Sequence, residues 1–140
     1  MTLVCDTGVV FAALVRADRH HTRCASLVVG HDGVVVVPSP VLVEVDQLAL
    51  RRGAPGATEA LLTSVDDGTL LVADLDSEDY RRVHALVRDY ADLPLGLVDA
   101  SVVAIAERLE QNTIATLDRR HFSVVRPSHV PAFTLVPEVS

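Results

Sequence analysis

The chain has 140 residues and a formal net charge of −7 at pH 7, and its basic residues are all arginines. The missing lysine excludes P-loops and Schiff-base enzymes, because both chemistries need that side chain. The negative charge argues against a generic basic surface that binds nucleic acid. This length fits a single domain over residues 1–140.

Hydrophobic residues make up 49% of the chain and aromatic residues only 4%. This composition suits buried parallel strands covered by helices, and it predicts an α/β fold. No apolar run reaches the roughly 18 residues that a membrane span requires, and no signal-peptide pattern is seen at the start. We therefore expect a cytoplasmic protein that does not enter a membrane.

The first predicted turn joins a strand to a helix. Residues 3–5 form an apolar run that ends at Asp6 and Thr7, and residues 9–15 follow with a helical pattern. Asp6 or Thr7 could simply cap this helix. In open α/β sheets, however, such a turn faces the crevice where ligands bind, so Asp6 is also a candidate functional acid.

Three further elements follow in the first half of the chain. Residues 20–29 predict a helix, residues 34–37 a strand, and residues 41–52 a second helix that carries Glu44 and Asp46. Both acids have apolar neighbours three or four positions away, so periodicity does not decide which one faces inward. We expect the other one to be solvated.

The middle of the chain predicts a helix over residues 55–66 and a strand over residues 69–73. The next helix ends near Tyr90, and Asp76 or Ser77 is expected to cap it. Asp76 also follows a strand. Position at a strand end therefore does not by itself identify a functional acid.

Residues 97–107 place apolar side chains on every side of a helix and a carboxylate, Asp99, in its first turn. A helix that is apolar all round is a buried helix. The positive end of the helix dipole favours the charge of Asp99, while the apolar surroundings remove its water. Asp99 therefore needs a partner, unless it merely caps the helix.

The last predicted elements are short. Residues 113–117 predict a fourth strand, and Asp118 leaves its carboxyl end as another candidate acid. The tail is expected to hold short edge strands at residues 124–125 and 133–136, because prolines interrupt it.

This order of elements predicts a three-layer α/β/α sandwich with a mainly parallel central sheet, whose strand ends share one rim. If Asp6, Glu44, Asp99 and Asp118 meet at that rim, their charges repel and no lysine neutralises them. Hard oxygen ligands favour Mg²⁺ or Mn²⁺. One or two such ions would activate a water for in-line attack on a phosphodiester.

Four parts of the sequence also carry a family resemblance. They are LVCDT at residues 3–7, Glu44, YADLPLGLVDAS at residues 90–101 and IATLDRRHF at residues 114–122. Together they resemble a PIN domain of the VapC toxin type, and the resemblance spans almost the whole chain. It favours Glu44 over Asp46.

The resemblance implies a parallel sheet between helices and Mg²⁺- or Mn²⁺-dependent endoribonuclease activity. Asp6, Glu44, Asp99 and Asp118 match the family's acidic catalytic and metal-binding positions. Thr7 and Thr116 match its polar positions beside them. The resemblance also implies inhibition by a cognate VapB-type antitoxin, homodimers, and structured RNA such as transfer RNA as substrate.

Because the protein is acidic overall, RNA affinity is expected to come from bound metal and from local arginines. The candidates are Arg81, Arg82, Arg88, Arg119 and Arg120.

Two other functions compete with the nuclease. In one, the acids hold a structural ion in a non-catalytic binding module. In the other, Asp6 is the nucleophile of a phosphatase. The second resembles a family with Asp-x-Asp at this turn, but Gly8 stands at the second acidic position here.

Overall fold

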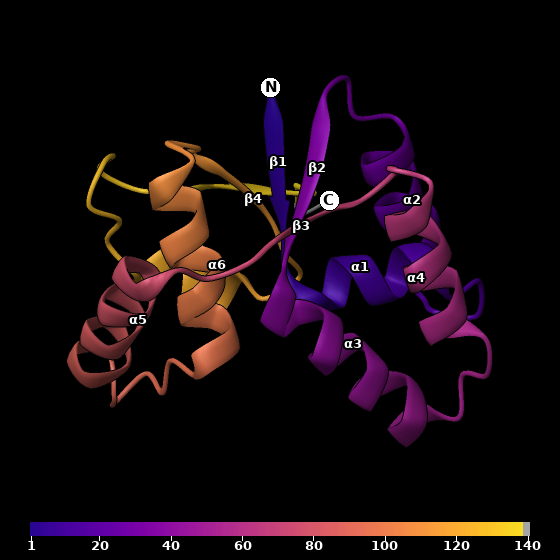
Figure 1. The fold of residues 1–140 in the computed structure, drawn as a ribbon, viewed down its shortest axis with the longest axis horizontal. Coiled ribbons are helices and arrows are strands. Elements are labelled where there is room, and N and C mark those ends of the chain that lie inside the picture. Colours follow the sequence, from indigo (N-terminus) through magenta and orange to yellow (C-terminus); the bar gives the residue numbers. More distant parts are fainter. Residues whose placement is uncertain (139–140) are drawn as a thin grey trace.

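The computed structural model describes residues 1–138 and contains a five-stranded sheet between two groups of helices (Figure 1). The strands are all parallel and lie in the order β3-β2-β1-β4-β5. They are β1 (Thr2–Cys5), β2 (Val34–Pro38), β3 (Leu71–Ala73), β4 (Thr113–Ala115) and β5 (Thr134–Val136). This confirms the predicted α/β class and parallel sheet.

Helices cover both faces of the sheet, as the sequence predicts. Figure 1 shows α5 and α6 on one side and α1 to α4 on the other. The helices of the described residues are α1 (Thr7–Leu14), α2 (His21–Val29), α3 (Ser39–Arg52), α4 (Ala57–Asp66), α5 (Ser77–Asp89), α6 (Leu97–Arg108) and α7 (Arg119–Val124). None of them has the length and apolar character that a membrane span requires.

Strand β1 lies at the centre of the sheet, where Val4 pairs with Val36 of β2 and with Ile114 of β4. Its apolar run is buried on both faces, which is typical of a central parallel strand. Gly33 precedes β2 at a φ of 144°, and a Cβ there would lie 2.1 Å from the Met1 carbonyl oxygen. Glycine at this position therefore lets β2 start close beside β1.

Helix α6 is buried along its middle, as its all-round apolar pattern predicts. Every residue from 100 to 106 is buried. Helix α5 packs against it and is joined to it by Arg82, which donates to the carboxylate of Glu107 at 2.7 and 2.9 Å. This pairing joins the middle of α5 to the C-terminal end of α6.

The structure resolves the cap of α5 and corrects the predicted tail. Asp76 caps α5, with its carboxylate accepting from the backbone N–H of Asp79 at 2.9 Å. The predicted strand at residues 124–125 is wrong, because Val124 ends helix α7. Asp118 starts that helix by accepting from the backbone N–H of His121 at 3.1 Å, and this local cap outweighs the β-propensity of the valines.

The remaining differences lie at the ends of elements. The first helix begins at Thr7 rather than at residue 9, and β4 ends at Ala115 rather than at residue 117. As a result, Thr7 and Thr116 lie at the turns that follow β1 and β4, and each places a polar side chain at the end of a strand.

Candidate functional site

Two acids follow the neighbouring central strands β1 and β4. The backbone N–H of Asp6 donates to the carbonyl of Ala115 at 2.9 Å, which continues the pairing of β1 with β4 one residue past the end of β1. The Thr116 hydroxyl donates to Oδ2 of Asp6 and accepts from the backbone N–H of Asp118, both at 2.9 Å. One buried hydroxyl therefore joins the strand ends that carry Asp6 and Asp118.

Helices α3 and α6 bring the other two acids to the same place. Asp6, Glu44, Asp99 and Asp118 all line one pocket of about 700 Å³. The four carboxylates expected to meet at the rim of the sheet are thus gathered there.

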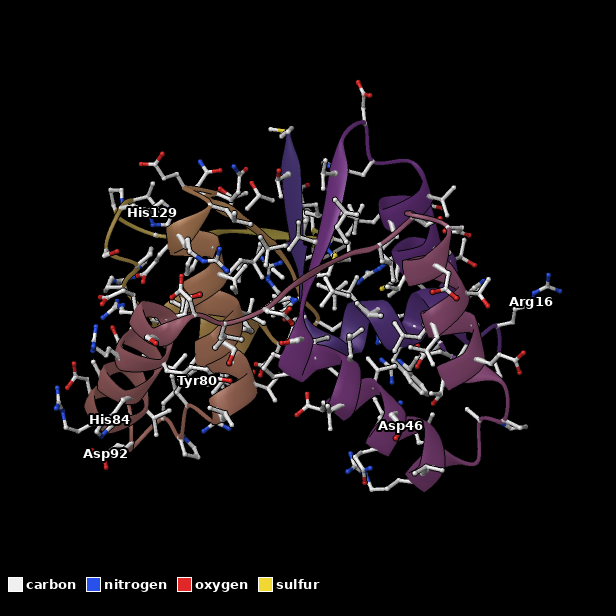
Figure 2. All side chains as sticks on the ribbon, viewed as in Figure 1. Arg16, Asp46, Tyr80, His84, Asp92 and His129 are labelled. Carbon is white, nitrogen blue, oxygen red and sulfur yellow. The ribbon has the colours of Figure 1, made fainter. Side chains whose placement is uncertain are left out.

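The structure also distinguishes Glu44 from Asp46 on α3. Asp46 does not line the pocket, and its carboxylate accepts a hydrogen bond from the Thr58 hydroxyl of α4 at 2.6 Å. Figure 2 shows Asp46 on α3, along the part of this helix that runs away from the sheet. Asp46 therefore joins α3 to α4, while Glu44 belongs to the acidic pocket.

Burial and mutual repulsion act on the acids of this pocket. Burial, together with the negative charges of Asp99 and Glu44, raises the pKa of Asp6 to about 7, although hydrogen bonds from the Thr7 backbone and the Thr116 hydroxyl act in the opposite direction. Burial also raises the pKa of Asp99, and nearby Asp118 and Glu44 add to this effect. A positive charge in this pocket would offset both the loss of solvation and the repulsion between the carboxylates.

Helix capping does not account for Asp6. Asp6 stands at the cap position of α1, but its side chain makes no capping bond and binds Thr116 instead. The next residue, Thr7, is 5% exposed and lines the pocket, and its hydroxyl has no hydrogen-bond partner within residues 1–138. A buried hydroxyl without a partner is costly, so this position suits a bound group that supplies one.

His121 is a residue of the site that sequence reasoning missed. Its Nδ1 lies 2.5 Å from Oδ2 of Asp118. Asp99, Asp118 and His121 each offer one ligand atom, and these atoms lie within 4.8 Å of one another. The spacing of Asp118 and His121, three residues apart at a helix start, was the available signal.

The donor set fits a divalent cation. Carboxylate oxygens dominate it, with hydroxyl groups and one imidazole nearby, and this chemistry suits Mg²⁺ or Mn²⁺. The positive charge of a cation there would favour the ionised form of Asp6, whose pKa is raised.

The expected arginines do not lie at this pocket. Arg119 donates to the backbone carbonyls of Leu135 and Pro137 at 3.3 Å, which anchors the segment of β5. On α5, Arg81, Arg82 and Arg88 pair with carboxylates of α5 and α6. The arginines that line the pocket are Arg19, Arg51 and Arg52, none of which was singled out from the sequence.

Comparisons with known proteins agree with this arrangement. The model of the PIN domain family matches residues 3–126. Ribonuclease VapC26 of Mycobacterium tuberculosis is 30% identical over 135 residues, which cover 96% of this chain and all of that protein.

Solved structures share the fold at lower sequence identity. The crystal structure of Mycobacterium tuberculosis VapC20, a toxin that cleaves the sarcin–ricin loop, superposes with a TM-score of 0.78 at 18% identity and covers 92% of this chain and 98% of that one. VapBC2 from Rickettsia felis, bound to a DNA fragment from its promoter, gives a TM-score of 0.66 at 15% identity, with 96% and 97% covered.

Proposed function

Because the chain belongs to the PIN-domain family and its VapC group, we propose that it is a metal-dependent endoribonuclease toxin of a toxin–antitoxin pair. The observation that carries this proposal is the gathering of four acids from four separate elements into one pocket. A purely structural role would not require Asp6 to be buried with a raised pKa beside two other carboxylates.

In this proposal, Asp6, Asp99 and Asp118 hold the cation, and Glu44 either joins them or orients the attacking water. Bound Mg²⁺ or Mn²⁺ would neutralise the carboxylates and supply the Lewis acidity that phosphodiester hydrolysis requires. The Thr116 hydroxyl orients both Asp6 and Asp118, and His121 holds the second oxygen of Asp118.

Thr7 contributes the remaining polar group at the turn after β1. Its unpartnered hydroxyl lines the pocket and can donate to a phosphate oxygen of RNA. Arg119 has no such position, because its guanidinium is engaged by the carbonyls beside β5. In this proposal, the pocket residues contact the RNA, and Arg119 does not.

We also propose a VapB-type antitoxin and a second copy of the chain as partners. Helices α3 and α4 expose large apolar side chains, namely Val43, Leu50 and Leu62. Exposed apolar surface of this kind is typical of protein interfaces. A structured RNA such as transfer RNA is the substrate that we expect.

The test is cleavage of RNA by purified protein in Mg²⁺ or Mn²⁺. Asp99→Asn should lower the cleavage rate by about 100-fold or more, the loss typical when a preorganised electrostatic group is removed. A chelator should abolish cleavage by the wild-type protein. Asp92→Asn is the matched control, because Asp92 is exposed in the loop before α6 and lies outside the pocket (Figure 2).

Unchanged cleavage in Asp99→Asn would contradict the role of this residue. Wild-type protein that binds Mn²⁺ but leaves RNA intact would instead support a non-catalytic module with a structural ion.

A further inference from the structure

Arginines on α5 and α6 pair with carboxylates, whereas two arginines at the acidic pocket do not in the described chain. Near α5 and α6, Arg82 pairs with Glu107 at 2.7 Å and Arg108 with Asp79 at 3.0 Å. In contrast, Arg19 and Arg51 are exposed and form no salt bridge within residues 1–138. Both of them line the acidic pocket, so arginines without a salt-bridge partner among the described residues share one pocket with the four acids.

Helix α3 places these opposite charges on one face. Glu44, Leu48, Arg51 and Arg52 are spaced as i, i+4, i+7 and i+8, and all of them line the pocket. At 1.5 Å per residue, Arg51 lies about 10 Å along the helix from Glu44. Glu44 and the two arginines therefore stand at different ends of this helix face.

A second groove continues from the pocket at the arginine end. It has a volume of about 770 Å³ and shares Phe11, Asp18, Arg19 and Arg52 with the acidic pocket. This volume lies in the range of about 300–1,000 Å³ that is common for small-ligand sites. Its floor includes apolar side chains of α1, and Arg16 extends outward from the α1–α2 loop at its rim (Figure 2).

Arg52 lines both spaces. Its guanidinium lies 5.3 Å from the centre of the Phe11 ring and 3.5 Å from Oδ2 of Asp18. Asp18 is the one carboxylate among the residues that line this second groove in the described chain. The groove therefore carries a surplus of positive charge, with Arg52 held in place and Arg19 left exposed.

We propose that this second groove binds the nucleotide next to the scissile phosphate of RNA, and that Arg19 and Arg51 bind the backbone phosphates that lead into it. The inference rests on the proposed nuclease function. Arginine matches phosphate oxygens with two parallel hydrogen bonds. Continuity with the acidic pocket favours the strand being cut over a protein segment, because the phosphates then run without a break from the acids to the arginines.

The experiment measures RNA binding with cleavage blocked. In an Asp99→Asn background, fluorescence anisotropy of a labelled single-stranded RNA oligonucleotide is followed in Mg²⁺ over a series of salt concentrations. Arg19→Ala with Arg51→Ala should weaken binding at least several-fold. The slope of log affinity against log salt should fall by about 1.4, which is the expected loss for two phosphate contacts on a single strand.

The matched control is Arg81→Ala with Arg88→Ala, in the same background. These arginines are also exposed, so the change in net charge is identical, but they lie on α5 outside both grooves. The control should keep the wild-type slope. Replacing Arg19 and Arg51 by lysine should restore most of the slope, because the charges return.

The inference is overturned if both alanine pairs weaken RNA binding equally, or if the Arg19 and Arg51 pair binds RNA normally and loses only the binding of an antitoxin. Cleavage assays without the Asp99 change separate the two proposals. If the wild type cleaves RNA and the groove variant cleaves it equally well, the nuclease stands and this inference fails. If the wild type does not cleave RNA, the nuclease itself fails.

Discussion

At the scale of single residues, the site depends on which oxygen contacts which hydrogen. The sequence predicts Asp6, Asp99 and Asp118 as candidates because each stands where an element begins or ends. Periodicity does not separate Glu44 from Asp46, because both have apolar neighbours on α3, and only the family resemblance favours Glu44. The Thr58 hydroxyl of α4 makes that distinction, and a contact between helices is not encoded in the period of one helix.

His121 gives a prediction about metal affinity. His121→Ala removes the contact between Nδ1 and Oδ2 of Asp118, so this carboxylate loses its fixed orientation. Mn²⁺ affinity should fall by roughly 10- to 100-fold, as is usual when a group that orients a ligand is removed. Isothermal titration with Mn²⁺ measures the change.

The control for this prediction is His84→Ala. His84 lies exposed on α5, on the far side of α6 from the sheet (Figure 2). Its loss should leave Mn²⁺ affinity unchanged. Equal affinities for the two variants would mean that His121 does not position Asp118.

At the scale of elements, burial is the property that the sequence predicts best. Helix α6 has apolar side chains on all sides and is buried as expected, because burial depends on composition within the helix itself. Helix α7 was missed because a side-chain contact starts it, from Asp118 to the backbone of His121. Hydrophobic periodicity registers the two valines as a strand pattern, but it carries no information about a side-chain cap.

Because α6 is buried, shortening one of its core side chains should leave a cavity and lower the free energy of unfolding. Ile105 is fully buried, so Ile105→Ala should lower the free energy of unfolding by about 3 kcal/mol. Leu97 in the same helix is 57% exposed, and Leu97→Ala should cost far less. Urea unfolding followed by circular dichroism measures both, and similar losses would show that α6 is not the buried element described here.

At the scale of the whole molecule, the sequence predicts a parallel sheet but not its strand order. Short apolar runs separated by helices indicate parallel strands with crossovers. That β1 lies between β2 and β4 depends on packing between segments far apart in the chain. The four acids meet because of that strand order. Periodicity carries no information about it, whereas the family resemblance does imply that the acids lie together.

The buried acids make the stability of the whole protein depend on pH. The folded pKa of Asp6 is about 7 and its ordinary value is 3.8, so the folded state binds this proton more tightly than the unfolded state. Without metal, stability is highest at low pH with respect to this group and is lost as pH rises to about 7. Ionisation of Asp6 alone should lower the free energy of unfolding by roughly 2–3 kcal/mol between pH 5 and pH 8.

Thermal unfolding in a chelator at these two pH values tests the prediction. Asp6→Asn should flatten the difference, because the amide does not titrate. Saturating Mn²⁺ should reverse the trend, since protons compete with the ion for the same oxygens. A metal-free wild-type protein that melts at a higher temperature at pH 8 than at pH 5 would count against the buried carboxyl as the cause.

The hydrogen bond from Thr116 to Asp6 joins residues that are 110 positions apart. During synthesis, Asp6 is made long before Thr116 and Asp118, which follow β4. No nascent chain shorter than 118 residues can contain the complete acidic set, whatever local structure it has already formed. The assembled site therefore cannot exist before the segment through Asp118 has been made, so every earlier part of the chain is synthesised without a complete acidic pocket.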